Sequence, residues 1–145
     1  MALRLTEIVI DCHDPAAQAS FWAAALGYHV VRAEGGQVEI GPWPEEPADL
    51  AEQVRRAPGV PTLVFVPVGE GKVVKNRLHL DVRPIDSLDS EVERLISLGA
   101  RPVDIGQGSV PWTVLADPEG NEFCLLGPLP SAPAEAGDDQ AEPVT

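Results

Sequence analysis

The segment RLHLDVRPIDSLDSEVERLISLGARPV, residues 77–103, contains the signals of a strand followed by a helix. Apolar and polar residues alternate at its start, which predicts a strand with one buried face. Asp86 stands where a helix would begin, and Gly99 follows an amphipathic stretch that fits a helix of about a dozen residues. The segment therefore predicts a strand and a helix joined by a short turn.

The same pattern occurs earlier in the chain, at an offset of 72 residues. The offset carries three marker residues onto their counterparts: Glu7 onto His79, Asp14 onto Asp86, and Gly27 onto Gly99. One matching interval would mean little, but agreement at all three places indicates an internal duplication. The first helix is also marked by Pro15, which suits the first helical turn.

Each copy continues with three strand-like segments. They are YHVVRA, GQVEIG and PTLVFVPV in the first copy, and ARPVDI, PWTVLA and NEFCLL in the second. Each half thus reads strand, helix, strand, strand, strand. The sequence DPEGN, residues 117–121, separates the last two strands, and its Pro and Gly suit a tight turn. We interpret it as a hairpin turn and not as a catalytic loop.

The phrases DCHDPAAQASFWAAALGY, KNRLHLDV and DPEGNEFCLL together resemble the glyoxalase/bleomycin-resistance/dioxygenase superfamily, which has the vicinal oxygen chelate fold. The resemblance is to its glyoxalase-like branch and covers residues 3–126. It implies an α+β fold of two βαβββ modules, residues 3–68 and 76–126, within one domain over residues 1–127. The eight strands would form a curved half-barrel sheet around a small-molecule cavity, with helices outside. The modules would pair within one chain or across a homodimer.

Composition excludes several kinds of partner. The formal charge is -13, with 23 acidic residues against ten basic ones, so a nucleic-acid partner is not expected. No apolar run approaches the roughly 20 residues that cross a bilayer, so we expect no membrane association and a cytoplasmic location. Residues 128–145 are rich in Pro, Ala and acids, which predicts a disordered tail.

Alternation assigns the faces of the strands. Three apolar side chains of the second copy are expected to pack against a helix: Leu78, Leu80 and Val82. Their polar neighbours then face the cavity: Arg77, His79 and Asp81. The same phasing gives the cavity-facing residues of the first and last strands: Glu7, Val9, Asp11, Glu122, Cys124 and Leu126. Gathering carboxylates around a histidine is costly unless they are solvated, paired or used, so this face predicts a site.

The resemblance also implies where a metal would bind. Metal-using members take ligands from the first and last strands of each module, which here gives Glu7, His79 and Cys124. The last strand of the first module offers only the inward candidates Val64 and Val66. Three ligands just suffice for a catalytic divalent ion, but the mixture of carboxylate, imidazole and thiolate is unusual for this fold. A metal is therefore less favoured than a metal-free polar cavity.

Several candidate site residues could have purely structural roles in place of the functional ones. His79 could be a buried neutral histidine bonded to Asp11 or Glu7, and Cys124 a small inert core residue. With only two cysteines, Cys12 and Cys124, free thiols are expected in a reducing compartment.

Aromatic residues and one long loop complete the candidate cavity. Trp43 and Trp112 lie near its mouth by family position and are candidates for an aromatic wall, whereas Trp22 is expected in the core. The long connection at residues 41–61 contains DLAEQVRRA, which predicts a short helix. That connection is either a lid or a surface insertion.

Two functions from different classes fit these features. The first is an enzyme of the lyase, isomerase or dioxygenase type acting on a small carbonyl or oxygenated compound. Glu7 would be the base and His79 a ligand or acid, while a metal or Arg77 would stabilise an enolate. The second is a metal-free binding protein of the bleomycin-resistance kind, which holds a cationic drug in an acidic cleft. A ligand-free regulatory module would predict a cavity blocked by large side chains, and the small Val64, Val66 and Cys124 argue against it.

Overall fold

The computed structural model describes residues 2–130, and it contains two successive modules. The first consists of β1 (Glu7–Cys12), α1 (Pro15–Leu26), β2 (His29–Glu34), β3 (Gln37–Gly41), α2 (Leu50–Arg56) and β4 (Thr62–Pro67). The second consists of β5 (Asp81–Val82), α3 (Leu88–Leu98), β6 (Arg101–Pro102), β7 (Thr113–Ala116) and β8 (Glu122–Leu125). The predicted α+β class and the repeat are confirmed. The predicted tail lies almost entirely outside the described residues.

Both long helices begin and end close to the predicted residues. The Asp14 side chain caps α1, and Gly27 ends that helix with a left-handed φ of 67°. Gly99 ends α3 in the same way, with φ 119°. The cap of α3 differs from the prediction, because Ser87 and not Asp86 precedes the first turn and accepts the capping bond.

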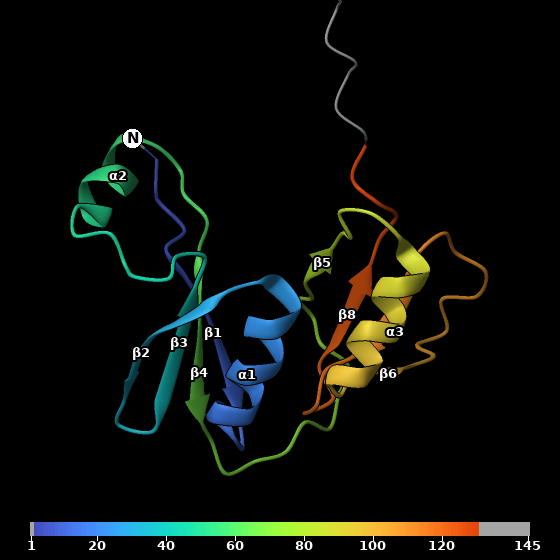
Figure 1. Cartoon of the computed structure of the whole chain (residues 1–145). Coiled ribbons are helices and arrows are strands. Elements are labelled where there is room, and N and C mark those ends of the chain that lie inside the picture. Colours follow the sequence, from blue (N-terminus) through green and yellow to red (C-terminus); the bar gives the residue numbers. More distant parts are fainter. Residues whose placement is uncertain (1, 131–145) are drawn as a thin grey trace, which may run out of the picture.

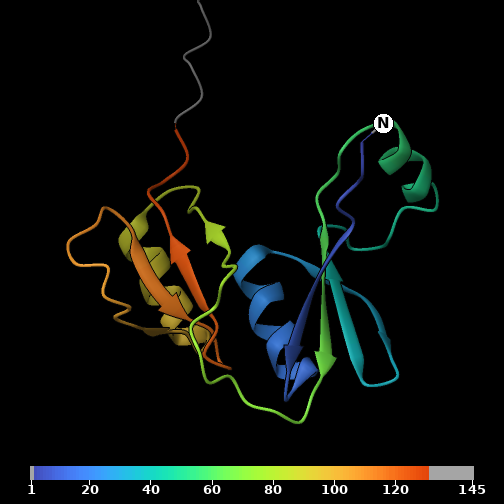
Figure 2. The ribbon, with the colours of Figure 1, turned by 180° about the vertical axis from the view of Figure 1, so that it is seen from behind.

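The eight strands form two four-stranded sheets. Their orders are β1-β4-β3-β2 and β5-β8-β7-β6, with β1 parallel to β4 and β5 parallel to β8. Figures 1 and 2 show the two sheets at opposite sides of the molecule, joined by the long linker after β4. Within the described residues, β1 and β5 each pair on one side only, so both present an open edge.

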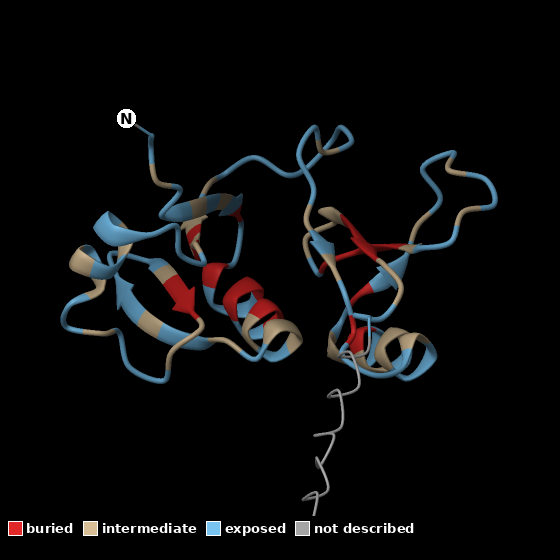
Figure 3. Cartoon of the chain, turned by 90° about the horizontal axis from the view of Figure 1, so that it is seen from above, coloured by how far each residue is buried: buried red, intermediate tan, exposed pale blue. Residues whose placement is uncertain are grey.

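The two modules share a hydrophobic core near α1. Trp22 and Phe21 of α1 pack against Phe123 of β8, with ring centroids 5.0 and 6.3 Å apart, respectively. Trp22 is buried, so its predicted core position is confirmed. Figure 3 shows buried segments on α1 and on strands of both modules. In residues 2–130, no helix is both long and apolar enough to traverse a lipid bilayer.

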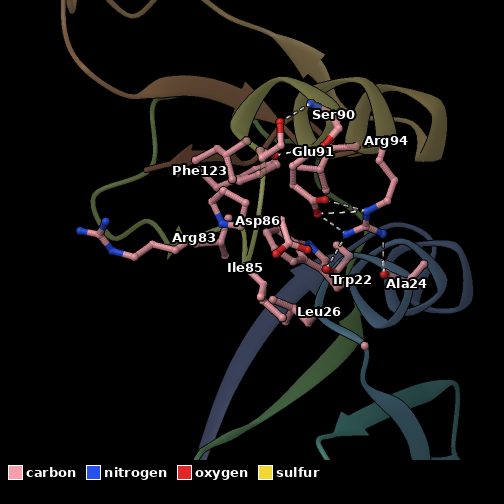
Figure 4. A pocket seen from close by; sticks show the side chains of 17 residues that line it. Trp22, Ala24, Leu26, Arg83, Ile85, Asp86, Ser90, Glu91, Arg94 and Phe123 are labelled. Atoms are coloured by element: carbon pink, nitrogen blue, oxygen red, sulfur yellow. Dashed lines mark hydrogen bonds and ion pairs between the residues drawn. The ribbon is translucent and has the colours of Figure 1, made fainter. Parts of the chain in front are cut away.

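A second link between the modules joins α3 to the end of α1. The Arg94 guanidinium donates to the carbonyl oxygens of Ala24 and Ala25, each at 2.9 Å, and pairs with Glu91 (Figure 4). These carbonyls belong to the last turn of α1, where a cation is favourable. Arg94 also lines a hollow of about 490 Å³ between the two helices and the β5–α3 turn. The helix pair is thereby fixed by a charged contact.

Candidate functional site

The first module presents a polar open face, as the alternation predicts. Ile8 and Ile10 pack against the core, whereas Glu7, Val9 and Asp11 are exposed. The pairing of β1 with β4 places Val9 beside Val64 and Asp11 beside Val66, respectively. On the next strand, Glu39 pairs with Val64 and therefore lies on the same face.

The second module follows the predicted alternation only in part. Of the segment NRLHLDV, only Asp81 and Val82 form a strand. Leu80 and Val82 pack against the core, but Leu78 is 90% exposed, so its predicted packing on a helix is wrong. The physical reason is that the residues before Leu80 do not pair with a neighbouring strand, and without a pleated ladder the strict alternation of faces is lost.

Three predicted residues meet on the open face of the second sheet. Asp81 lies opposite Cys124 in the parallel β5–β8 pair, and His79 Nε2 lies 3.2 Å from Asp81 Oδ1. One potential ligand atom from each of these residues lies within 4.8 Å of the others. The His79 side chain is 42% exposed and faces Asp81, so the alternative of a buried histidine bonded to Asp11 or Glu7 is wrong.

An imidazole nitrogen, a carboxylate oxygen and a sulfur at this spacing fit a divalent ion with three protein ligands. Burial raises the pKa of Cys124, and the charge of Asp81 and a hydrogen bond with Asp81 raise it further. The thiol is therefore protonated at neutral pH, and an arriving metal must displace its proton. The metal ligands predicted from the resemblance were Glu7, His79 and Cys124. Within one chain, the carboxylate that lies near His79 and Cys124 is that of Asp81.

Glu7 lies on the first sheet, beside a hollow of about 470 Å³ beneath α2. At the base of this hollow, Glu39 is only 8% exposed and accepts a hydrogen bond from the Thr62 hydroxyl at 2.8 Å. Its other oxygen lies 3.8 Å from an Arg32 nitrogen. Trp43 forms part of the wall. Sequence reasoning missed Glu39, although the alternation of QVEIG could have placed it on this face.

The connection over residues 41–61 forms the roof of this hollow. Its predicted short helix is confirmed as α2, whose Leu50, Ala51 and Val54 line the hollow. Arg4 Nε fastens the helix by donating to the Val54 carbonyl at 2.9 Å. The position of α2 therefore supports the lid interpretation over that of a plain surface insertion.

A larger cavity of about 700 Å³ lies between the modules. It contains four of the predicted site residues: Asp11, Arg77, His79 and Glu122. Its apolar lining includes Leu5, Val9 and Leu78, all of them exposed. Trp112 lies apart from these residues, partly exposed immediately before β7.

Glu122 is engaged by residues of the chain itself. Its carboxylate accepts hydrogen bonds from Lys72 Nζ at 2.9 Å and from the Asn76 amide at 3.0 Å. Burial of Glu122 opposes its ionisation, but these hydrogen bonds outweigh that effect and lower its pKa to about 2. Glu122 lines the cavity, yet both of its oxygens already have partners.

This pKa predicts an acid-dependent loss of stability. The ordinary glutamate value is 4.5, so between about pH 4.5 and 2 the unfolded chain binds more protons at Glu122 than the folded one. The ionised Glu122 thereby contributes on the order of 3 kcal/mol to the free energy of unfolding. This contribution is complete above that pH range and is lost as the pH falls through it. Urea unfolding at pH 7, 5 and 3 should show a shallower acid decline for Glu122→Gln than for the wild type. The prediction would be contradicted if the free energy of unfolding fell equally with pH in Glu122→Gln and in the wild type.

The DPEGN turn is confirmed as a hairpin between β7 and β8, but its acids also reach the first module. The buried Asp117 Oδ2 accepts from Gln18 Nε2 at 2.5 Å and from Trp22 Nε1 at 3.0 Å. Glu119 accepts from the His13 and Asp14 amides, at 2.6 and 2.9 Å, at the start of α1. The turn therefore holds the two modules together.

Comparisons with known proteins agree with this architecture. The family model described as "Glyoxalase-like domain" matches residues 7–126. A crystal structure of a glyoxalase/bleomycin resistance protein/dioxygenase family enzyme from Burkholderia phytofirmans PsJN has 19% identity and a TM-score of 0.60, over 88% of this chain and 100% of that one. No curated protein matches the chain.

Two further solved structures share the fold. A glyoxalase-related enzyme from Fulvimarina pelagi has 15% identity and a TM-score of 0.55, over 85% of this chain and 86% of that one. The protein named Oxidase ChaP-H2 has 16% identity and a TM-score of 0.54, over 95% of this chain and 100% of that one. Identities this low establish the fold alone. With the family model spanning both modules, the chain belongs to the glyoxalase-like domain family.

Proposed function

We propose that this protein is a cytoplasmic enzyme that acts on a small carbonyl or oxygenated compound, by a lyase, isomerase or dioxygenase type of reaction. The observation that carries the proposal is the convergence of His79, Asp81 and Cys124 on one open sheet face, with ligand atoms within 4.8 Å. These residues would hold a divalent ion. Such an ion, when bound, polarises the oxygen of a carbonyl substrate.

The remaining site residues have roles that follow from their chemistry. Glu7 is an exposed carboxylate and would take a proton next to the substrate carbonyl. Arg77 lines the cavity between the modules and would stabilise negative charge that develops on the substrate oxygen. Glu7 belongs to the first sheet and His79 to the second module, so the two must be brought to one site.

A homodimer would bring them together. Strands β1 and β5 each have an open edge, and open edges are surfaces on which a second chain can add. Exposed apolar residues lie beside these edges: Leu5, Val9 and Leu78. We propose that the β1 edge of one copy meets the β5 edge of another, so that Glu7 of one subunit faces the His79 group of its partner.

Val9→Lys should convert the dimer into a monomer. Val9 lies on the β1 edge and is 58% exposed, so a lysine there places a charge in the proposed interface. Val30→Lys is the matched control, because Val30 is 55% exposed on β2, at the other edge of the same sheet. Sedimentation velocity measures the outcome. A monomeric wild type, or equal behaviour of the two variants, would contradict the dimer.

Metal content tests the site itself. After dialysis against Co²⁺ and removal of excess ion, the wild type should retain about one metal per chain. His79→Ala should retain almost none, because it removes the nitrogen ligand. His29→Ala is the control, since His29 is an exposed histidine on β2. Retention of metal by His79→Ala, or its absence from the wild type, would rule out the proposed site.

A second candidate function is metal-free binding of an organic cation, and one observation favours it. The hollow beneath α2 combines the buried Glu39 carboxylate, the Trp43 ring and the apolar side chains of α2. An aromatic wall favours a cationic ligand, and such a ligand would contact the Glu39 carboxylate beside Arg32, which lies 3.8 Å from it. In this function the protein would sequester its ligand without chemical change.

Calorimetric titration with benzylamine and with neutral benzyl alcohol distinguishes the two functions. The sequestration function predicts that the amine binds more tightly and that Glu39→Gln removes the difference. Glu93→Gln, at an exposed position of α3, should leave the difference unchanged. Equal binding of the two compounds by the wild type would eliminate this candidate.

A further inference from the structure

The residues between β4 and β5 bring His79 to the site with little help from secondary structure. Residues 68–80 contain no strand, and only at Leu80 does a ladder-type bond to β8 begin, from the Cys124 amide at 3.0 Å. Burial does not hold this segment either, because Val73 and Leu78 are almost fully exposed. Something other than a strand ladder or a packed core must therefore fix its course.

Glu122 provides that fixation at two points. One carboxylate oxygen accepts from the Lys72 ammonium at 2.9 Å, and the other accepts from the Asn76 amide at 3.0 Å. The same ammonium donates to the Val74 carbonyl at 2.7 Å, so it also holds the backbone between those two points. A further bond joins the side chains of Asn76 and Asn121 at 3.3 Å.

The hydrogen bonds of Glu122 with Lys72 and Asn76, which we call the clamp, lie close to the group formed by His79, Asp81 and Cys124. Glu122 and Cys124 are two residues apart on β8, so their side chains lie on the same face of the strand. Asp81 pairs with Cys124, and His79 precedes Asp81 by two residues. The strand that carries the thiol therefore also carries the carboxylate that anchors the approach of the histidine.

We propose that Glu122 is a positioning residue: it anchors residues 72–76 on β8 and thereby holds the His79 imidazole against Asp81 and Cys124. The inference rests on the proposed function in so far as His79 belongs to a metal site. This position requires a carboxylate, because a carboxylate supplies two strong hydrogen-bond acceptors. The Glu122 and Lys72 side chains are also only 13% and 19% exposed, respectively, so water competes little for their ion pair. An amide at this position offers one acceptor and directs its donors at an ammonium or an amide.

The test compares Glu122→Gln and Lys72→Met with Glu93→Gln, whose exposed carboxylate lies on α3. Hydrogen exchange of the metal-free full chain should show faster exchange in residues 72–80 for both clamp variants, beyond any uniform change that follows from lower global stability. The ring signals of His79 in NMR spectra should shift in the same variants. Co²⁺ affinity should fall about tenfold or more in Glu122→Gln, as expected when a residue that supports a metal ligand is lost.

The outcomes separate this inference from the metal proposal. If the wild type binds no Co²⁺, the proposed metal site fails, but exchange and the His79 ring signals still judge the clamp. Unchanged exchange in residues 72–80, or unchanged ring signals, in Glu122→Gln would overturn the inference even if the wild type binds metal. Loss of Co²⁺ affinity without those local changes would also overturn it, because the effect would then be electrostatic.

Discussion

Asp117→Asn is expected to lower the free energy of unfolding by about 3 kcal/mol. Asp117 is buried and accepts hydrogen bonds with both oxygens. Oδ2 faces the side-chain donors of Gln18 and Trp22, and Oδ1 faces the backbone amides of Glu119 and Asn121. Whichever way an asparagine turns, its amide nitrogen points at donors, so one set loses its acceptor and meets a second donor.

Urea unfolding at pH 7 measures this loss. Asp104→Asn is the matched control, because Asp104 is exposed in a loop and accepts from the nearby Gly106 amide. The control should change the free energy of unfolding by no more than about 0.5 kcal/mol. Similar small changes in both variants would show that the Asp117 network contributes little to joining the modules.

Cys124→Ser is expected to lower the affinity for Zn²⁺ and Co²⁺ by about 100-fold or more, because a hydroxyl is a poor substitute for a thiolate toward these ions. It should also change the pH dependence of binding. In the wild type, the raised pKa of the Cys124 thiol means that metal binding releases its proton, so affinity should rise by about tenfold per pH unit on this account. The serine variant should lose that contribution to the slope.

Cobalt titration followed by absorbance provides the measurement, since a thiolate bound to Co²⁺ gives a charge-transfer band. Cys12→Ala serves as the control. Cys12 is a buried thiol of the first module whose pKa is raised to about 11 by burial and by nearby acids, foremost Glu119 and Asp14. The Cys12→Ala substitution should leave the charge-transfer band intact. A band that persists in Cys124→Ser, or one that disappears in Cys12→Ala, would contradict the assignment of Cys124 as a ligand.

The sequence predicted those parts of the fold that local chemistry determines. The offset between Glu7 and His79 predicted the duplication, the helix ends followed from Asp14 and from glycine, and alternation assigned the faces of β1 and β8. The helix ends and the strand faces depend on neighbours within a few residues, which periodicity and capping preferences describe well. The glyoxalase-like fold itself was inferred from resemblance, and the described residues form it as two four-stranded sheets.

The parts that were missed depend on contacts between distant residues. Within DPEGN, each residue had an adequate turn role, so nothing local indicated that Asp117 would bond to Gln18 and Trp22. Likewise, Leu78 alternates like a strand residue, but whether a strand forms there depends on a neighbour to pair with. The metal set was predicted as Glu7, His79 and Cys124, whereas the carboxylate that lies near His79 and Cys124 within one chain is that of Asp81, because Asp81 follows His79 by two residues and pairs with Cys124.

The DPEGN contacts have a consequence for how the chain is made. Gln18 and its acceptor Asp117 are 99 residues apart, and the His13 amide is 106 residues from the Glu119 carboxylate that accepts from it. During synthesis from the N-terminus, α1 leaves the ribosome long before either acid is translated. The helix can form early through its own Asp14 cap. The buried Gln18 and Trp22 donors of this helix, however, stay without their Asp117 acceptor until the β7–β8 hairpin emerges, so this hairpin completes the packing of the first module.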